Sequence, residues 1–294
     1  MRWPEGFVCP QCGGTKAWLA QRARHICAAC RHQATVTAGT IFHDRHLPLP
    51  LLFRAFWQVT SQKYGARALG VQRVLGLGSY ETAWSWLHKL RRAMVRPGRD
   101  RLSGRVEVDE TYVGGLAEGK RGRGAARKAL VVIAAQEAGP GIGRIRLARV
   151  ADATAASLVG FVQQAVAPGS PVHTAGWRSS AALAAAGYRH EFSRLHDQGP
   201  EAATKLLPRV HRVAALLKRW LLGTHQGAVA PAHLDYYLDE FTFRFNRRTS
   251  ASRGKLFYRL VEQAVQVEPA PRASLVGGKN NPHHNPSRSV ESKG

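Results

Sequence analysis

Between residues 104 and 262, hydrophobic positions recur with a period of two in some segments and of three to four in others. In Val106–Val113 valines alternate with polar residues, so this segment predicts a β-strand that ends at a diglycine turn. Residues 129–135 and 143–150 predict two more strands, separated by a Gly-Pro-Gly turn. The pattern continues as helix, strand, Ala-rich helix and strand over 153–167, 171–177, 178–187 and 188–193, and then as one long helix. This order predicts an α/β domain.

Residues 47–97 have a helical period instead. Apolar residues recur at spacings of three and four, at Leu51, Leu52, Ala55, Phe56 and Val59. A second helix before Gly76 and a third after Ser79, which suits an N-cap, predict a helix-turn-helix-like DNA-binding module. Its third helix ends in basic residues that favour a phosphate backbone, namely His88, Lys89, Arg91, Arg92 and Arg96. The alternative is a plain helical connector whose basic residues are merely solvated.

All four cysteines lie near the start of the chain, in two Cys-x-x-Cys pairs formed by Cys9 with Cys12 and Cys27 with Cys30. This spacing, with residues suited to tight turns after each pair, predicts a zinc ribbon over residues 1–46 that holds structural Zn²⁺ through four thiolates. The alternatives are two disulfides or a redox dithiol. An intracellular setting argues against disulfides, and a redox motif does not need the second pair.

The net charge of the chain indicates which class of partner it binds. It has 43 Lys and Arg against 19 Asp and Glu, which gives a net charge of +24. A positive excess of this size favours a polyanionic partner, and nucleic acid is the leading one, with ribosomal or membrane-surface binding as the alternative. We see no signal-peptide pattern and no apolar run long enough to span a membrane, so we expect a cytoplasmic, nucleoid-associated protein.

Several motifs together make the chain resemble the IS1595 family of bacterial insertion-sequence transposases, which carry the ISXO2-like transposase domain. Besides the cysteine quartet, the resemblance rests on Ala38–Phe42, Gly78–Trp84, Val108–Gly115, Leu217–His225 and Tyr237–Arg248. The last segment is the most specific, because Glu240, Arg244 and Arg247 reproduce the family's acid-arginine-arginine spacing. The element order over 104–262 is also that of an RNase H-like (DDE-type) core.

The resemblance implies two-metal DNA strand cleavage and joining, in which carboxylates hold two divalent ions about 3.5–4 Å apart. Mg²⁺ suits such oxygen ligands. Asp109 matches the family's first catalytic aspartate and would bind this cofactor. The second stands in a Thr-Asp-Gly-Trp motif, which here has Ala175 in place of the aspartate. A methyl group cannot bind a cation, so the resemblance implies that one metal ligand is lost.

For the third catalytic position we favour His211 and Lys218, which lie seven residues apart and share a helix face. We assign Glu240, Arg244 and Arg247 to the site on the family's spacing. Without the resemblance, Asp109 could equally be a strand acid paired with an arginine. The arginines of residues 244–248 could be a solvated helix face, but the phenylalanines between them favour a nucleic-acid groove.

Three acids are candidate replacements for the missing aspartate. Glu110 should point away from Asp109 in a regular strand. Asp152 precedes a helix and suits an N-cap. Asp197 is the third, and none of the three is convincing.

Three functions remain open from the sequence. The first is a transposase, acting as a homo-oligomer on paired ends of its element and on target DNA, with strand transfer lost or impaired. The second is a non-catalytic DNA-binding protein that occupies the terminal inverted repeats. The third, favoured by charge alone, is a zinc-ribbon protein of RNA or ribosomal assemblies.

The two ends of the chain carry expectations of their own. Residues 263–294 are rich in Pro, Ser, Gly, Asn and Lys, which predicts a disordered tail. Members of the resembled family usually have a helical lead-in before the Arg-Trp-Pro that here starts at Arg2. We therefore expect a late start codon or a truncated copy.

Overall fold

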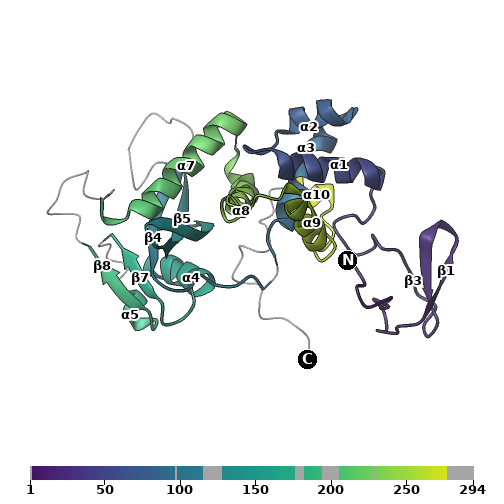
Figure 1. Cartoon of the computed structure of the whole chain (residues 1–294), viewed down its shortest axis with the longest axis horizontal. Coiled ribbons are helices and arrows are strands. Elements are labelled where there is room, and N and C mark those ends of the chain that lie inside the picture. The colour runs from purple at the N-terminus through teal and green to yellow at the C-terminus, as the bar shows by residue number, and fades with distance from the viewer. Residues whose placement is uncertain are drawn as a thin grey trace. The chain divides into compact units, whose positions relative to one another are not determined.

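The computed structural model of the chain describes residues 2–96, 98–114, 128–175, 182–193, 205–227 and 229–276 (Figure 1). Two compact units are present. One is formed by Met1–Arg96 together with Ala251–Gly277, and the other contains Pro97–Ser250. None of the described helices combines the length and the apolar character that a bilayer crossing requires.

The first unit begins with a small antiparallel ribbon. Its strands pair in the order β1-β2-β3. The elements are β1 (Ala17–Ala20), the 3-10 turn η1 (Gln21–Ala23), β2 (Arg24–Cys27) and β3 (Gln33–Ala34). Few apolar side chains are buried here, so the ribbon has little hydrophobic core of its own.

The rest of this unit is helical. Its helices are α1 (Leu49–Ser61), α2 (Ala68–Leu75), α3 (Tyr80–Ala93), α9 (Arg253–Ala264) and α10 (Arg272–Val276). As predicted, α2 ends at Gly76, whose φ of 62° is left-handed, and the Ser79 side chain caps α3 by accepting from the Glu81 N–H at 3.2 Å. The buried side of α1 carries Leu52, Ala55, Phe56 and Val59, in agreement with the predicted apolar face.

The basic end of α3 differs from the prediction of a helix that faces phosphates. His88, Arg91 and Arg92 are buried, and only Arg96, just beyond the helix, is exposed. The helix packs against α2, α9 and α10, so it is the central helix of its unit. Charge alone did not show which side of α3 other helices would cover.

The C-terminal segment also differs from the predicted domain boundary. The α/β domain was expected to reach residue 262, but α9 belongs to the first unit, where it packs against α1 and α3. Part of the predicted disordered tail is also ordered, because α10 buries Leu275 completely. The remainder, from residue 277, lies outside the described residues. An amphipathic helix does not encode which of two cores it will join. The sequence therefore could not reveal that α9 and α10 belong to the first unit.

The second unit is built on one five-stranded mixed sheet. Its strands are β4 (Val106–Val113), β5 (Ala129–Ala138), β6 (Gly141–Val150), β7 (Pro171–Thr174) and β8 (Arg189–Phe192). They lie in the order β6-β5-β4-β7-β8, with β5 antiparallel to both β4 and β6, and β7 parallel to both β4 and β8. Counted along the domain the order is 3-2-1-4-5, which confirms the predicted RNase H-like fold.

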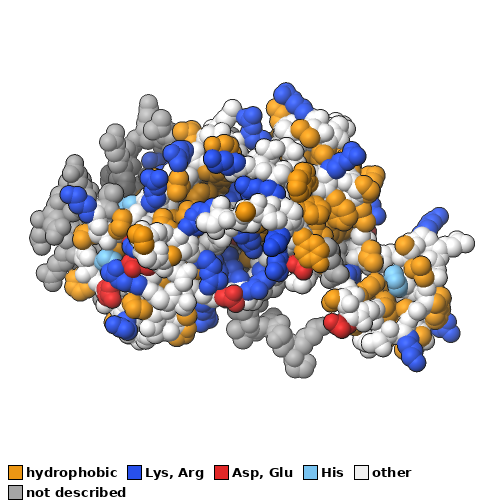
Figure 2. All heavy atoms as spheres, viewed as in Figure 1, with side chains coloured by type: hydrophobic (Ala, Val, Ile, Leu, Met, Phe, Trp, Pro, Cys, Tyr) orange, Lys and Arg blue, Asp and Glu red, His pale blue; other side chains and the backbone are white. Residues whose placement is uncertain are grey.

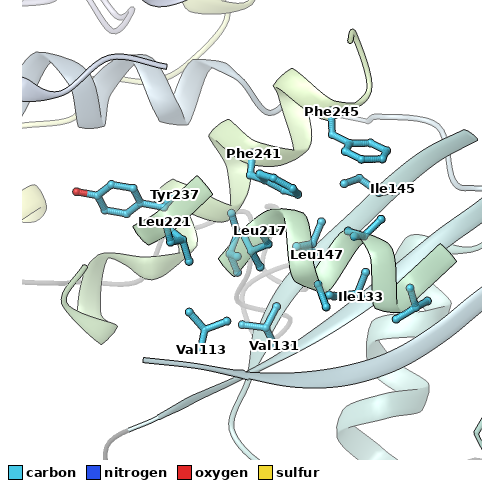
Figure 3. Packing of buried hydrophobic residues seen from close by; sticks show 14 of the residues in the cluster. Val113, Val131, Ile133, Ile145, Leu147, Leu217, Leu221, Tyr237, Phe241 and Phe245 are labelled. Carbon is cyan, nitrogen blue, oxygen red and sulfur yellow. The ribbon is translucent and has the colours of Figure 1, made fainter. Parts of the chain in front are cut away.

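Helices cover both faces of this sheet. The helical elements are α4 (Ala155–Ala165), α5 (Ala182–Ala185), α7 (Pro208–His225), the 3-10 turn η3 (Pro231–His233) and α8 (Leu234–Phe245). On one face α7 and α8 pack on the sheet, where Figure 3 shows Leu217 from α7 beside Leu147 and Phe245 from α8 beside Ile145. On the other face α4 and α5 pack over Val106, Val108 and their neighbours.

Side-chain alternation along β4 decides which residues reach the α7 face. Val106 and Val108 belong to the core under α4, whereas Val113 belongs to the core under α7. Because successive strand residues point to opposite faces, Glu107 and Asp109 share the α7 face with Val113.

Asn246, just after α8, closes the outer edge of the sheet. Its side-chain oxygen accepts from the Ile145 N–H at 2.7 Å, and its amide nitrogen donates to the Ile145 carbonyl at 3.1 Å. The side chain thus pairs with β6 as a neighbouring strand would, and it satisfies the main chain of a fully buried residue.

We therefore expect Asn246→Ala to lower the free energy of unfolding by about 1–3 kcal/mol, since the Ile145 N–H loses its acceptor and the Ile145 carbonyl keeps only the Arg146 guanidinium as a donor. Denaturant unfolding of the full chain would measure this change. Thr249→Ala, an exposed position nearby, is the matched control and should leave the transition unchanged. Equal effects of the two substitutions would show that the side-chain pairing contributes nothing.

Candidate functional site

Asp109, in the middle of β4, and Ala175, just after β7, are neighbours in the register of these two parallel strands. The register pairs Val108 on β4 with Thr174 on β7, so the next residues along the two strands are Asp109 and Ala175. Val172 belongs to the core under α4, so alternation directs Ala175 to the α7 face, which Asp109 also shares. The expected neighbourhood of Asp109 and the 172–177 segment is therefore present, with a methyl group at the second position.

Helix α7 brings an imidazole to the same place. The Nε2 atom of His211 lies 3.9 Å from the Oδ2 atom of Asp109, and the two side chains are 30% and 19% exposed. A half-buried carboxylate beside an imidazole is a pair of groups that can bind a cation or exchange a proton. Of the two residues proposed for the third position, His211 is thus the one that the structure brings to Asp109.

Lys218 lies farther along the same helix. Seven residues correspond to about 10 Å along the helix axis, so its ammonium group is two turns beyond His211. Burial lowers the pKa of Lys218, and the charge of Lys128, the residue before β5, lowers it further. Lys128 is thus near enough to act on the charge of Lys218, and sequence reasoning had found only Lys218.

The start of α7 is held by a residue that sequence reasoning missed. Glu107, two positions before Asp109 on the same face, has a side chain that is only 1% exposed. Its carboxylate accepts hydrogen bonds from the main-chain N–H groups of Arg209 and Val210, at 2.8 and 3.0 Å, and from the Arg209 guanidinium at 2.9 Å. A strand carboxylate therefore caps the first turn of α7, where unpaired N–H groups favour negative charge.

Further ion pairs surround this cap. Arg209 also contacts the carboxylate of Glu137 at 3.0 Å, and Arg105 joins Glu137 to Glu191, at 2.8 Å in each case. The network links β4, β5, β8 and α7. It fixes the helix on the sheet next to the position where His211 meets Asp109.

Glu240, Arg244 and Arg247 lie on or just after α8, which packs against β6. The carboxylate of Glu240 is 1% exposed and pairs with the Arg244 guanidinium at 2.8 Å, while Arg247 lies over the Phe243 ring at 4.1 Å from its centroid. In the sheet, β5 separates β6 from β4, which carries Asp109. A catalytic role for these three residues stays a prediction.

The prediction of a nucleic-acid groove formed by aromatic and basic residues on α8 is wrong for its aromatic residues. Phe243 and Phe245 are 4% and 8% exposed, and Phe245 packs in the core against the sheet. Rings buried in this way cannot stack on bases. Their spacing in the sequence reflects core packing. Of the arginines of residues 244–248, Arg248 is exposed, while Arg244 and Arg247 are half-buried.

The acids considered as replacements do not fill the gap beside Asp109. Glu110 pairs in register with Val132, whose side chain belongs to the core under α4, so it lies on the opposite face of β4. Asp152 accepts hydrogen bonds from Thr154 and Ser157, which lower the pKa of its carboxyl group. The N-cap of α4 is Thr154 rather than Asp152, as the Ser157 N–H bonds to the Thr154 hydroxyl. Asp197 lies outside the described residues.

These donors do not fit a pair of divalent ions. Over the described residues, the cysteine quartet is the one group of three or more His, Cys, Asp or Glu side chains that converge as metal ligands. Where β4 runs beside the end of β7, Asp109 offers a carboxylate and Ala175 offers none. We therefore derive no metal-dependent step from this arrangement.

The cysteine quartet, in contrast, fits zinc. All four are free thiols, and their sulfur atoms lie within 4.8 Å of one another. The Sγ atoms of Cys9 and Cys30 and those of Cys12 and Cys27 are each 3.6 Å apart. Tetrahedral zinc with sulfurs at about 2.3 Å would set each pair about 3.8 Å apart. The disulfide alternative is therefore excluded.

The turns around the quartet explain this geometry. The Gly13 N–H bonds to the Cys9 carbonyl at 2.9 Å, and the Arg31 N–H bonds to the Cys27 carbonyl at 3.1 Å, with positive φ at both Gly13 and Arg31. A Cβ atom at Gly14 would lie 3.4 Å from two of the sulfurs, so a glycine leaves room beside the site. Hydrogen bonding from the Cys30 main chain lowers the pKa of the Cys27 thiol to about 6, which favours its thiolate.

Comparisons with known proteins agree with this architecture. The family model of the ISXO2-like transposase domain matches residues 101–246, and that of the transposase zinc-ribbon domain, also of the IS1595 family, matches residues 1–33. No curated protein matches the chain.

Two solved structures, the Mos1 strand transfer complex and a pre-cleavage Mos1 transpososome, are each 11% identical to it with a TM-score of 0.28. The alignments cover 72% and 74% of this chain and 78% and 79% of those chains. A TM-score of 0.28 is too low to support a fold assignment, which therefore rests on the strand order of the five-stranded sheet. The two family matches, which together span more than half of the sequence, show that the chain belongs to the IS1595 family of insertion-sequence transposases.

Proposed function

We propose that this chain is a DNA transposase that binds the terminal inverted repeats of its element, and that its Mg²⁺-dependent strand cleavage and transfer are impaired by Ala175. The observation that carries the proposal is the register of β4 and β7. It sets Asp109 beside Ala175 on the face that α7 covers, where an aspartate in place of the alanine would give two adjacent carboxylates. One side-chain difference then separates the described arrangement from a pair of acidic metal ligands.

The residues around Asp109 have distinct proposed roles. With an aspartate in place of Ala175, Asp109 would bind Mg²⁺ together with it, and His211, within 3.9 Å of Asp109, would be the third member of the site. Lys218, with Lys128 close by, would hold a phosphate of the DNA strand. Glu240, Arg244 and Arg247 would support the DNA from α8.

DNA binding has support independent of the catalytic residues. Figure 2 shows Lys and Arg side chains over much of the visible face and acidic side chains in few places, in keeping with the net charge of +24. A surface of this kind binds double-stranded DNA through its phosphates. We propose that the ribbon and the helical module recognise the element ends, and that two or more copies of the chain assemble on paired ends.

The methyl side chain of Ala175 also supports a second candidate function. If Ala175 abolishes metal binding, the chain remains a DNA-binding protein that occupies the terminal inverted repeats without cutting them. It would then compete with active copies of the transposase. The RNA or ribosomal alternative loses its support, because membership of a transposase family explains the ribbon and the charge together.

Cleavage of a duplex that carries the element end, in buffer with Mg²⁺, tests the proposal. We expect no detectable cleavage by the unchanged chain. Ala175→Asp should cleave at a rate at least about 100-fold above the detection limit, since a metal ion contributes several kcal/mol to the stabilisation of the transition state. Ala185→Asp, which adds the same acid at an exposed site on α5, is the matched control and should stay inactive. Asp109→Asn should abolish the activity that Ala175→Asp restores.

Two results would contradict the proposal. Equal cleavage by the unchanged chain and by Ala175→Asp would show that the metal ligands are misassigned. Equal affinity for the element end and for a random duplex, measured over a series of salt concentrations, would remove the site-specific part of the proposal.

A further inference from the structure

One face of the β1-β2-β3 ribbon presents an aromatic ring and polar side chains to solvent. The register pairs Trp18 on β1 with Ile26 on β2, and Ile26 with Gln33 on β3, so these three side chains share a face. Arg24, two residues before Ile26, lies on the same face by alternation. Trp18, Arg24 and Gln33 are exposed, and the Arg24 guanidinium donates to the Gln33 side-chain oxygen at 3.1 Å. We call this the Trp18 face.

The opposite face of the ribbon is used by other parts of the chain. It carries Cys27, a member of the cysteine quartet, and His25. The His25 ring stacks with that of Phe7 at 5.6 Å between centroids, and it lies edge-on to the Trp3 ring at 5.1 Å. The N-terminal segment and the zinc ligands therefore occupy that side, and the Trp18 face remains for a partner.

An arginine from outside the strands reaches over the Trp18 face. Arg31 follows the second cysteine pair, and its guanidinium carbon lies 4.9 Å from the centre of the Trp18 ring. The ring attracts a cation in this position. Because the contact holds the planar guanidinium in place, less side-chain entropy is lost when it hydrogen-bonds to a partner. Arg31 is itself exposed.

The backbone at Arg31 indicates that its side chain serves something other than the fold. The two Cys-x-x-Cys turns are built alike, because the residue after each pair donates its N–H to the carbonyl of the first cysteine. This residue has a left-handed φ in both turns, 75° at Gly13 and 60° at Arg31. Glycine adopts such a φ without strain, whereas a residue with a Cβ atom does not. The second turn thus has an arginine where a glycine would suit the fold better.

The charge and the residue types of the ribbon indicate its partner. Residues 1–46 contain six Lys and Arg but only two Asp and Glu, and neither acid lies in the three strands. This excess complements a polyanion. Arginine and glutamine are also the side chains that recognise guanine and adenine through paired hydrogen bonds in the major groove of DNA.

We propose that the Trp18 face enters the major groove of the duplex at the element end, where Arg31 donates hydrogen bonds to a guanine. Arg24 and Gln33 contact neighbouring base edges, and Trp18 is a positioning residue that holds the Arg31 guanidinium. The groove is about 12 Å wide and admits a β-ribbon. The inference deepens the proposed function, on which it rests, by naming the ribbon residues that read the element end.

Arg31→Gly tests the inference without endangering the fold, because glycine already occupies the matching position of the first turn. Fluorescence anisotropy would measure the affinity of the full chain with its zinc for an element-end duplex and for a random duplex of equal length. We expect binding to the element end to weaken by roughly tenfold, the loss of one good base contact, and binding to the random duplex to weaken clearly less. The zinc content should be unchanged, and the thermal unfolding temperature unchanged or higher.

Arg22→Gly is the matched control. Arg22 is also exposed and has a φ of 58°, but it lies in the η1 turn between β1 and β2. The substitution removes the same charge from the same ribbon and relieves a similar backbone strain. We expect it to weaken binding to both duplexes by the same small factor, because it changes only the net charge.

Substitutions on β1 test the role of the aromatic ring. Trp18→Ala should weaken binding to the element end by roughly threefold, since Arg31 loses the ring that holds it. Trp18→Phe keeps a ring beneath the guanidinium and should retain most of the affinity. Leu19→Ala is the control, because Leu19 is the next residue, is exposed and points to the opposite face. It should bind as the unchanged chain does.

Two results would overturn the inference. One is an Arg31→Gly chain that prefers the element end over the random duplex as strongly as the unchanged chain. The other is an Arg22→Gly chain that loses this preference to the same extent as Arg31→Gly, because the ribbon would then contribute charge alone. The proposed function survives both results, since the unchanged chain still prefers the element end. If the unchanged chain has no such preference, the proposed function fails, and the inference that rests on it fails too.

Discussion

Removal of zinc is expected to unfold the β1-β2-β3 ribbon around the four cysteines while the five-stranded sheet stays folded. The ribbon has three short strands and few buried apolar side chains, so it cannot offset the loss of chain entropy by itself. Structural zinc contributes about 10–16 kcal/mol of binding free energy in small zinc domains, and that energy is also their folding energy. Hydrogen exchange after treatment with a chelator should therefore show protection lost in β1 and β2 but kept in β4 and β5.

Single substitutions make this expectation specific to the quartet. Cys12→Ser should abolish stoichiometric zinc binding, measured by atomic absorption, because serine is a poor zinc ligand at neutral pH. His32→Gln is the matched control: this histidine lies beside the second cysteine pair and could in principle replace a thiolate. We expect it to retain one zinc per chain. A Cys12→Ser chain that keeps its zinc would show that the metal is held elsewhere.

Local signals in the sequence were enough to predict most of the fold. The alternation in Val106–Val113, the glycine after α2 and the Ser79 cap each act within a few residues, and each was found where expected. The order of strands and helices then limited the sheet to few topologies, because βαβ crossovers have one hand. The two cysteine pairs similarly predicted their own turns.

The features that could not be predicted depend on partners far away in the sequence. Glu107 looked like an ordinary strand acid, because its partners at residues 209 and 210 are about a hundred positions downstream. Asn246 belongs to a recognised motif, but its pairing with Ile145 appears only in three dimensions. Arg91 and Phe243 were misinterpreted for the same reason: their residue types suggest nucleic acid, and their burial shows packing. His211 was predicted near Asp109 because the resemblance supplied the long-range information, and its role in the site stays a prediction.

The cap on α7 yields the second large effect. Glu107→Ala should lower the free energy of unfolding by about 3–5 kcal/mol, because it leaves the half-buried Arg209 guanidinium without its closest carboxylate and two N–H groups of the helix without an acceptor. Glu107→Gln keeps an oxygen that can accept from those N–H groups but removes the charge, so we expect a smaller loss. Denaturant unfolding followed by hydrogen exchange in α7 would measure both.

Glu137→Gln is the control that distinguishes the effect of the capping hydrogen bonds from the effect of an ion pair with Arg209. Glu137 contacts the same guanidinium of Arg209, but its carboxylate is 22% exposed, so its loss should cost about 1 kcal/mol or less. If Glu107→Ala, Glu107→Gln and Glu137→Gln all cost the same, the capping hydrogen bonds contribute nothing and the network acts through charge alone. If instead Glu107→Ala alone loosens the first turn of α7, the strand that carries Asp109 also sets the position of His211. The buried Glu107 carboxylate, which lies on the same strand as Asp109 and binds the helix turn that carries His211, then aligns these two candidate site residues.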